Sequence, residues 1–121
     1  MNKTQKRIEK RVYYWQDKLG LKNWDIVVKF SNKYKHPNQT DIFRGLARTQ
    51  SDSQYLMGNI NFTPTMLKMV DDETIVHELL HCLMSETFGY FNSNYNKQGK
   101  NWVEYYQENI ISQLARIILR K

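Results

Sequence analysis

The residues with the clearest chemical potential are His77, Glu78 and His81, which form the pattern His-Glu-x-x-His. Four residues advance a helix by about 400°, so in a helix the two histidines project from one face, about one turn apart. Two imidazoles at that spacing can bind one zinc ion. Glu78 lies about 100° around such a helix from His77, where it can approach a metal-bound water without being a ligand. The pattern therefore predicts a metal site with an adjacent general base.

Two histidines do not complete a catalytic zinc site, which usually has three protein ligands and a water molecule. His36 lies far upstream, no histidine follows His81, and the downstream carboxylates are Glu86, Glu104 and Glu108. Glu86 would lie about 140° off the face of His81 on the same helix. Glu104 and Glu108 are one turn apart at the margin of an apolar helix face, where a carboxylate is costly unless a cation is present. Spacing alone leaves both as candidates for the third ligand.

The elements that must position these residues follow from the hydrophobic periodicity of the chain. Apolar residues at helical spacing predict helices over 4–19, 72–88 and 102–119. Runs of β-branched and aromatic residues predict strands over 24–30, 43–50 and 55–62.

The sequence also predicts the connections between these helices and strands. Residues 51–54 are turn-like, so the last two strands form an antiparallel hairpin, while 36–40 and the polar, Asn-rich 89–101 are loops. Gly20 is placed to end the first helix. The order predicts an α+β domain with a small, mainly antiparallel three-stranded sheet.

Length and composition exclude several other classes of protein. The 121 residues suffice for one domain, 1–121, and no apolar run is long enough for a membrane helix. The start of the chain lacks the apolar segment of a secretory signal, and the lone Cys82 cannot form an internal disulfide, so we expect a cytoplasmic protein. The net charge of the chain is +6, made up of +7 in residues 1–35 and −1 in residues 36–121, so the basic excess belongs to the N-terminal end.

Three segments resemble a family of small zinc metallopeptidases encoded largely by bacteriophages and mobile elements and related to the minigluzincins. They are 19–26, 74–81 and 108–115, which together span most of the chain. The resemblance implies a minimal zincin domain that binds one zinc ion through His77, His81 and Glu108, with Glu78 as general base. One position departs from the family: Ser112 stands where an Asn or an acid is common.

The resemblance also implies a function: a monomeric, gluzincin-like metalloendopeptidase in the bacterial cytoplasm that hydrolyses peptide bonds of a protein or peptide. The hairpin strand nearest the motif helix could bind substrate as an added strand. The sequence identifies no donor for an oxyanion.

Two alternatives remain. One is a non-hydrolytic, zinc-binding regulatory or DNA-associated protein, favoured by basic residues that could contact the phosphates of a nucleic acid, Lys3, Lys6, Arg7, Lys10 and Arg11. The other is a purely structural zinc site. Three protein ligands with a glutamate beside the fourth position favour an open site over a closed one.

Overall fold

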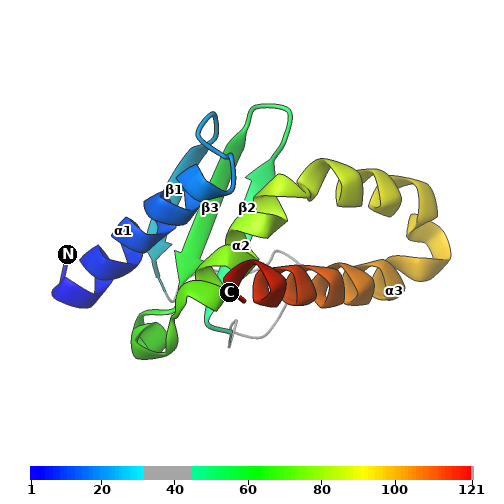
Figure 1. The fold of residues 1–121 in the computed structure, drawn as a ribbon. Coiled ribbons are helices and arrows are strands. Elements are labelled where there is room, and N and C mark those ends of the chain that lie inside the picture. The colour runs from blue at the N-terminus through cyan, green and yellow to red at the C-terminus, as the bar shows by residue number, and fades with distance from the viewer. Residues whose placement is uncertain (32–44, 121) are drawn as a thin grey trace.

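The computed structural model describes residues 1–31 and 45–120, with the side chains of all of these except 88–104. Its elements follow the predicted order and confirm an α+β fold (Figure 1). They are α1 (Lys3–Lys18), β1 (Asp25–Phe30), β2 (Ala47–Asp52), β3 (Met57–Phe62), the 3-10 helix η1 (Pro64–Met69), α2 (Asp72–Leu83) and α3 (Ser85–Leu119). His36 and the expected loop at 36–40 lie outside the described residues.

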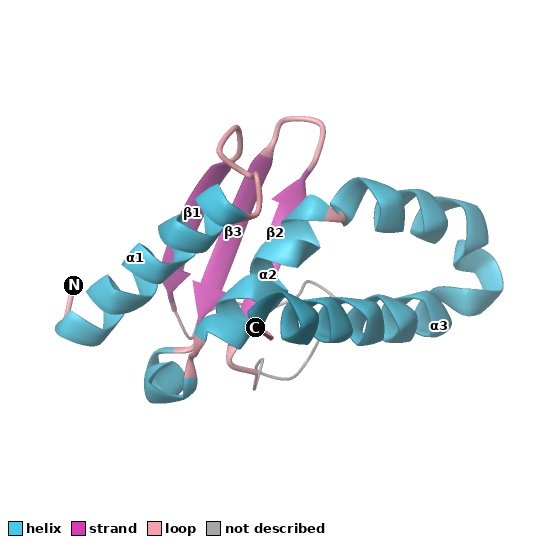
Figure 2. Ribbon diagram, viewed as in Figure 1, coloured by secondary structure: helices cyan, strands magenta, loops and turns pink. Residues whose placement is uncertain are grey.

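The three strands form a mixed sheet with the order β1-β3-β2. β2 and β3 pair antiparallel, as the hairpin prediction requires, whereas β1 pairs parallel with β3. The sheet is therefore not mainly antiparallel, because β1 adds to the far side of β3 after a long connection rather than through a tight turn. β2 is left at one edge, on the side of the sheet nearest α3 (Figure 2).

Helix α1 is fixed at both ends by local signals. Asn2 and Gln5 form a reciprocal capping box at its start, and Gly20, with φ of 74°, follows its end. Ile8 and Val12, one turn apart, are fully buried. α1 and α2 cover the same face of the sheet (Figure 2), where these residues join the core.

Helix α2 is apolar on two sides. Ile75 and Leu79 pack with the sheet residues of the main core, while Val76 and Leu80 pack against Ile111 and Ala115 of α3 in a second cluster. Asp71 caps the helix by accepting a hydrogen bond from the Thr74 amide. With these two sides committed to packing, His77 and His81 are left on a third side of the helix, between α3 and β2.

The segment 89–101, predicted as a loop, instead lies inside α3. The predicted helix over 72–88 is divided, since α2 ends at Leu83 and α3 begins at Ser85. Figure 1 shows that the ribbon of α3 leaves the end of α2, turns back on itself in its yellow to orange part, and returns beside α2. This return brings the C-terminal part of α3 to the histidines. No helix in the described ranges is long and apolar enough to cross a membrane.

Candidate metal centre

His77, His81 and Glu108 meet at one point. The Nε2 atom of His77 lies 3.0 Å from Oε2 of Glu108, and Nε2 of His81 lies 3.1 Å from Oε1 of the same carboxylate. One potential ligand atom from each residue lies within 4.8 Å of the other two, so the group could hold a metal ion. Two imidazole nitrogens and a carboxylate oxygen form a donor set that zinc accepts.

Packing between α2 and α3 brings Glu108 to this point. Ile111 and Ala115, one turn apart on α3, are fully buried against Val76 and Leu80 of α2. Glu108 and Ser112 are one turn apart and lie beside these two buried residues on α3. When Ile111 and Ala115 pack against α2, the side chains of Glu108 and Ser112 therefore face the histidines. The glutamate placed at the histidines among the described side chains is thus Glu108.

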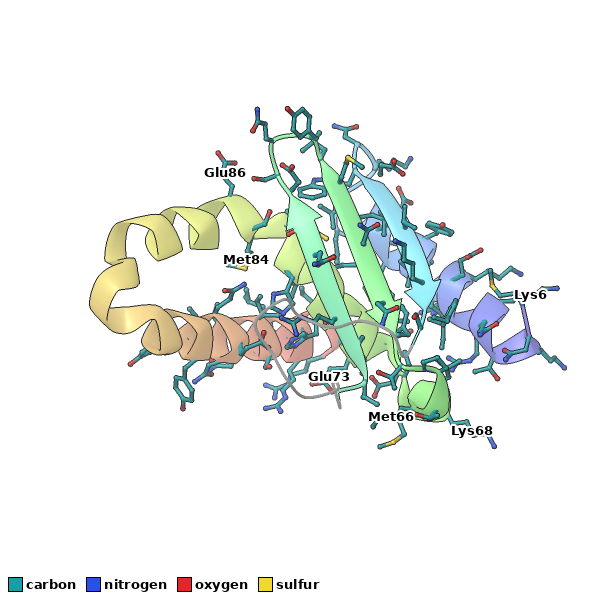
Figure 3. The ribbon with its side chains drawn as sticks, turned by 180° about the vertical axis from the view of Figure 1, so that it is seen from behind. Lys6, Met66, Lys68, Glu73, Met84 and Glu86 are labelled. Atoms are coloured by element: carbon teal, nitrogen blue, oxygen red, sulfur yellow. The ribbon has the colours of Figure 1, made fainter. Side chains whose placement is uncertain are left out.

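The other two candidates for the third ligand, Glu86 and Glu104, are not placed at the histidines by the described side chains. Glu86 is exposed on the outgoing part of α3 and points away from its returning part (Figure 3), as its spacing from His81 predicted. The side chain of Glu104 lies outside those that the structure describes, so its part in the site stays untested.

The electrostatics of the cluster reflect shared hydrogen bonds. Both histidines bond to Glu108, which holds the pKa of this carboxyl far below its ordinary value although burial opposes the shift. The hydrogen bond to Glu108 in turn raises the pKa of His77. The Glu108 side chain is 58% exposed. The cluster is therefore held by charge and hydrogen bonding at an accessible surface.

The second ring nitrogen of each histidine also has a neighbour on α3. Oγ of Ser112 lies 3.4 Å from Nδ1 of His77, and Nε2 of Gln107 lies 3.2 Å from Nδ1 of His81. A histidine that binds a metal through Nε2 carries its proton on Nδ1, which needs an acceptor. The Ser112 hydroxyl supplies one. The Gln107 amide supplies one when its oxygen faces the ring. Ser112, the departure from the family pattern, thus lies where it can orient His77.

Glu78 lies in the wall of the same site. It is 5% exposed, and its Oε2 atom is buried with no hydrogen-bond partner in the described part of the chain. Burial raises the pKa of this carboxyl, with nearby Glu108 adding to the rise and the histidines opposing it. A buried carboxylate with an unsatisfied oxygen is costly unless the site supplies it with a proton, a water or a cation.

A pocket of about 470 Å³ brings the site together. Residues of β2, α2 and α3 line it: Ala47, Arg48, Thr49, His77, Glu78, His81, Gln107 and Glu108. The Thr49 hydroxyl donates a 3.2 Å hydrogen bond to the backbone carbonyl of Glu78, which fixes β2 against α2. A second pocket, of about 370 Å³, shares Ala47, His77 and Glu78 and continues toward Asp71 and Glu73.

Sequence reasoning found His77, Glu78 and His81 from their spacing but missed Gln107, Arg48 and Thr49. Gln107 immediately precedes Glu108, and this adjacency was its only local signal. Arg48 and Thr49 reach the pocket only because β2 lies beside α2, a pairing between segments far apart in the chain.

The basic N-terminal cluster lies elsewhere, and parts of it serve the fold. Arg11 donates two hydrogen bonds to Asp72, and Arg7 donates one to the Val70 carbonyl. Figure 3 places Lys6 at the end of the molecule opposite the turn of α3. Cys82 is fully buried, and burial raises the pKa of its thiol to about 12, in keeping with the prediction of a small core residue rather than a nucleophile.

Comparison of the chain with protein-family models, with curated proteins and with solved structures finds no match. The likeness to the minigluzincin-related peptidases therefore rests on the three sequence segments, and the candidate metal site rests on the geometry of His77, His81 and Glu108.

Proposed function

We propose that this protein is a zinc-dependent peptidase in which His77, His81 and Glu108 hold the metal and Glu78 is the general base. The observation that carries the proposal is the meeting of two histidine Nε2 atoms and one carboxylate beside a second, buried carboxylate with an unpartnered oxygen. An open site with three protein ligands and a neighbouring glutamate is typical of hydrolytic zinc and not of structural zinc.

In this proposal the metal and Glu78 have separate chemical roles. Zinc held there supplies a Lewis acid that polarises a carbonyl and makes a nearby water more acidic. Glu78 accepts the proton of the attacking water and then delivers it to the nitrogen of the leaving amine. Burial supports both steps, because it raises the pKa of the Glu78 carboxyl. A carboxylate with a raised pKa takes up a proton more readily near neutral pH, so Glu78 is a stronger base for the attacking water.

The edge of β2 supports a peptide as the substrate. Among the described strands β2 pairs only with β3, so its other side offers backbone donors and acceptors beside the pocket. An extended peptide that pairs with this edge would lie along Ala47, Arg48 and Thr49, which line the site. Strand addition would also hold the scissile bond in a fixed orientation.

The test combines metal content with hydrolysis. We expect about one zinc per chain in the purified protein, loss of zinc in His77→Ala, and cleavage of an unfolded protein such as casein by the zinc-loaded chain. Glu78→Gln should retain zinc and lose at least about 100-fold in rate, because it keeps the shape and removes the base. Met66→Leu, at a partly buried position of η1 away from the site, is the control. Undiminished hydrolysis by Glu78→Gln would refute the general-base assignment.

A further inference from the structure

Helix α1 presents a row of positive charges to solvent on the side opposite the core. At about 100° per residue, these positions fall within a sector of about 120° around the helix axis. The fully buried Ile8 and Val12 lie on the other side. The exposed members of this surface, which we call the α1 basic face, are Lys3, Lys6, Arg7, Lys10, Tyr14 and Lys18. One acid lies in the same sector, Asp17, and it pairs with Lys22.

The fold uses only a small part of this charge. Arg7 contributes one hydrogen bond, to the Val70 carbonyl at 3.4 Å. In the part of the chain that the structure describes, Lys3, Lys6 and Lys10 form no ion pair. The packing of α1 against its neighbours therefore does not depend on these three lysines, and they are available to a partner.

The same charges are unfavourable for the helix itself. Lys3 and Arg7 are four residues apart, as are Lys6 and Lys10, and like charges at this spacing destabilise a helix. The first turn of α1 contains no acidic residue, although the positive end of the helix dipole favours negative charge there. A bound polyanion would relieve both effects, so the pattern favours a partner with several negative charges.

We propose that the α1 basic face binds the phosphate backbone of double-stranded DNA. From Lys3 to Lys18 the face extends about 22 Å, at about 1.5 Å per residue. A DNA strand carries one phosphate per about 3.4 Å of duplex axis, so a duplex offers enough phosphates over this length for every cation of the face. Phosphate contacts do not read the bases, so binding is independent of DNA sequence and weakens as the salt concentration rises.

Two other anionic partners match the α1 basic face less well. Helices that bind at a membrane surface bury an apolar side in the lipid. On α1 that side, with Ile8 and Val12, is already packed into the core. Single strands bind where their bases stack on aromatic rings, whereas the Tyr14 ring is already stacked with the Arg11 guanidinium, 4.4 Å from the ring centroid. A rigid duplex fits a row of charges fixed on one helix best.

The α1 basic face is separate from the metal centre. No described residue of α1 lines either of the two pockets beside His77. Figure 3 places Lys6 at the end of the molecule opposite the turn of α3. DNA binding is therefore independent of the proposed peptidase function, and the two can be tested separately.

The test is the fluorescence anisotropy of a labelled duplex of about 20 base pairs, titrated with the full chain at about 50 mM and 200 mM NaCl. We expect Lys6→Gln/Lys10→Gln to raise the Kd at least about tenfold at the lower salt concentration. The slope of log K against log salt should become shallower by about two, since each lost phosphate contact removes about 0.9.

The matched control is Lys29→Gln/Arg120→Gln, which removes the same charge from exposed positions on β1 and after α3. It should change the Kd by less than about threefold, because these positions lie off the α1 basic face. Equal weakening by the two double variants would show that only the net charge matters and would overturn the proposal. Circular dichroism verifies that each variant folds.

Further measurements separate this proposal from the peptidase and from other partners. His77→Ala should bind the duplex as tightly as the wild type, whether or not the chain hydrolyses peptides. A single strand of the same length and vesicles that contain phosphatidylserine should compete weakly. The absence of saturable duplex binding at the lower salt concentration, loss of binding in His77→Ala, or stronger competition by the single strand or the vesicles would each overturn the proposal.

Discussion

At the scale of single residues, the site depends on which glutamate reaches the two histidines. Glu108 bonds to Nε2 of both His77 and His81, whereas spacing along α3 allowed either Glu104 or Glu108. The choice depends on the rotation of α3 against α2. Buried contacts of Ile111 and Ala115 determine this rotation, and the sequence does not reveal it.

The Glu108 assignment makes a direct prediction about metal affinity. Loss of a residue that hydrogen-bonds to a metal ligand typically weakens metal binding by about 10- to 100-fold. Glu108→Gln should weaken zinc binding more than this, because it removes a ligand itself. Glu104→Gln, one turn away on the same helix, should leave the zinc Kd within about threefold. Competition with a chromophoric chelator measures both. The reverse ranking would transfer the ligand role to Glu104.

Gln107 makes a smaller contribution that is also measurable. Replacing it with Leu removes the partner of His81 Nδ1 and should raise the zinc Kd by about 10- to 100-fold. Gln113→Leu is the matched control, since Gln113 is exposed on the same helix and bonds to Asn109. If both variants bind zinc as tightly as the wild type, Gln107 does not orient the histidine.

At the scale of elements, most helices and strands follow from local pattern, and their pairing does not. Ile8 and Val12 revealed α1, and the turn-like residues 51–54 revealed the β2–β3 hairpin, although its turn lies at 53–56. The parallel addition of β1 to β3 depends on contacts between segments some thirty residues apart, so the sequence pattern could not distinguish it from an antiparallel arrangement. The helical backbone over 89–101 was also missed, because a polar, Asn-rich segment lacks apolar periodicity.

The contact between β3 and α2 leaves no space at Gly58. A Cβ atom there would lie 2.7 Å from Sγ of Cys82 and 3.0 Å from Cδ1 of Ile26. Gly58→Ala should therefore lower the free energy of unfolding by about 1–3 kcal/mol. In a Cys82→Ala background the same change should cost less, because the nearest atom is gone. Urea denaturation of the four chains measures this coupling, and strictly additive effects would show that the two residues do not clash.

The contact between α1 and α2 predicts a pH dependence. Hydrogen bonds from Arg11 hold the pKa of Asp72 below its ordinary value. A carboxyl whose pKa is lower in the folded state stabilises the protein above its unfolded pKa of about 3.9, and this stabilisation is lost as the pH falls through the folded pKa. The pair is more than a third exposed, so Asp72→Asn should cost at most about 1 kcal/mol at pH 7.

The same variant should differ progressively less from the wild type as the pH falls below about 4. Thermal unfolding across this range measures the difference. Asp17→Asn is the control, since Asp17 forms a more exposed ion pair with Lys22 and its loss should change stability by less than about 0.5 kcal/mol. A gap between Asp72→Asn and wild type that widens in acid would contradict the stabilising role of Arg11.

At the scale of the whole molecule, α2, the edge strand β2 and the returning part of α3 lie close together among the described elements (Figure 1), and residues from all three line one pocket. The largest part of the basic excess, a net charge of +4, lies in α1, whose residues do not line this pocket. The central claim is that the pocket is a zinc centre formed by residues of α2 and α3.

A crystal structure of the zinc-loaded protein, with anomalous scattering measured at the zinc absorption edge, tests this claim most directly. We expect one zinc ion about 2.0–2.2 Å from Nε2 of His77, Nε2 of His81 and a carboxylate oxygen of Glu108. Zinc bound away from the two histidines, or a carboxylate other than that of Glu108 as the third ligand, would contradict the account.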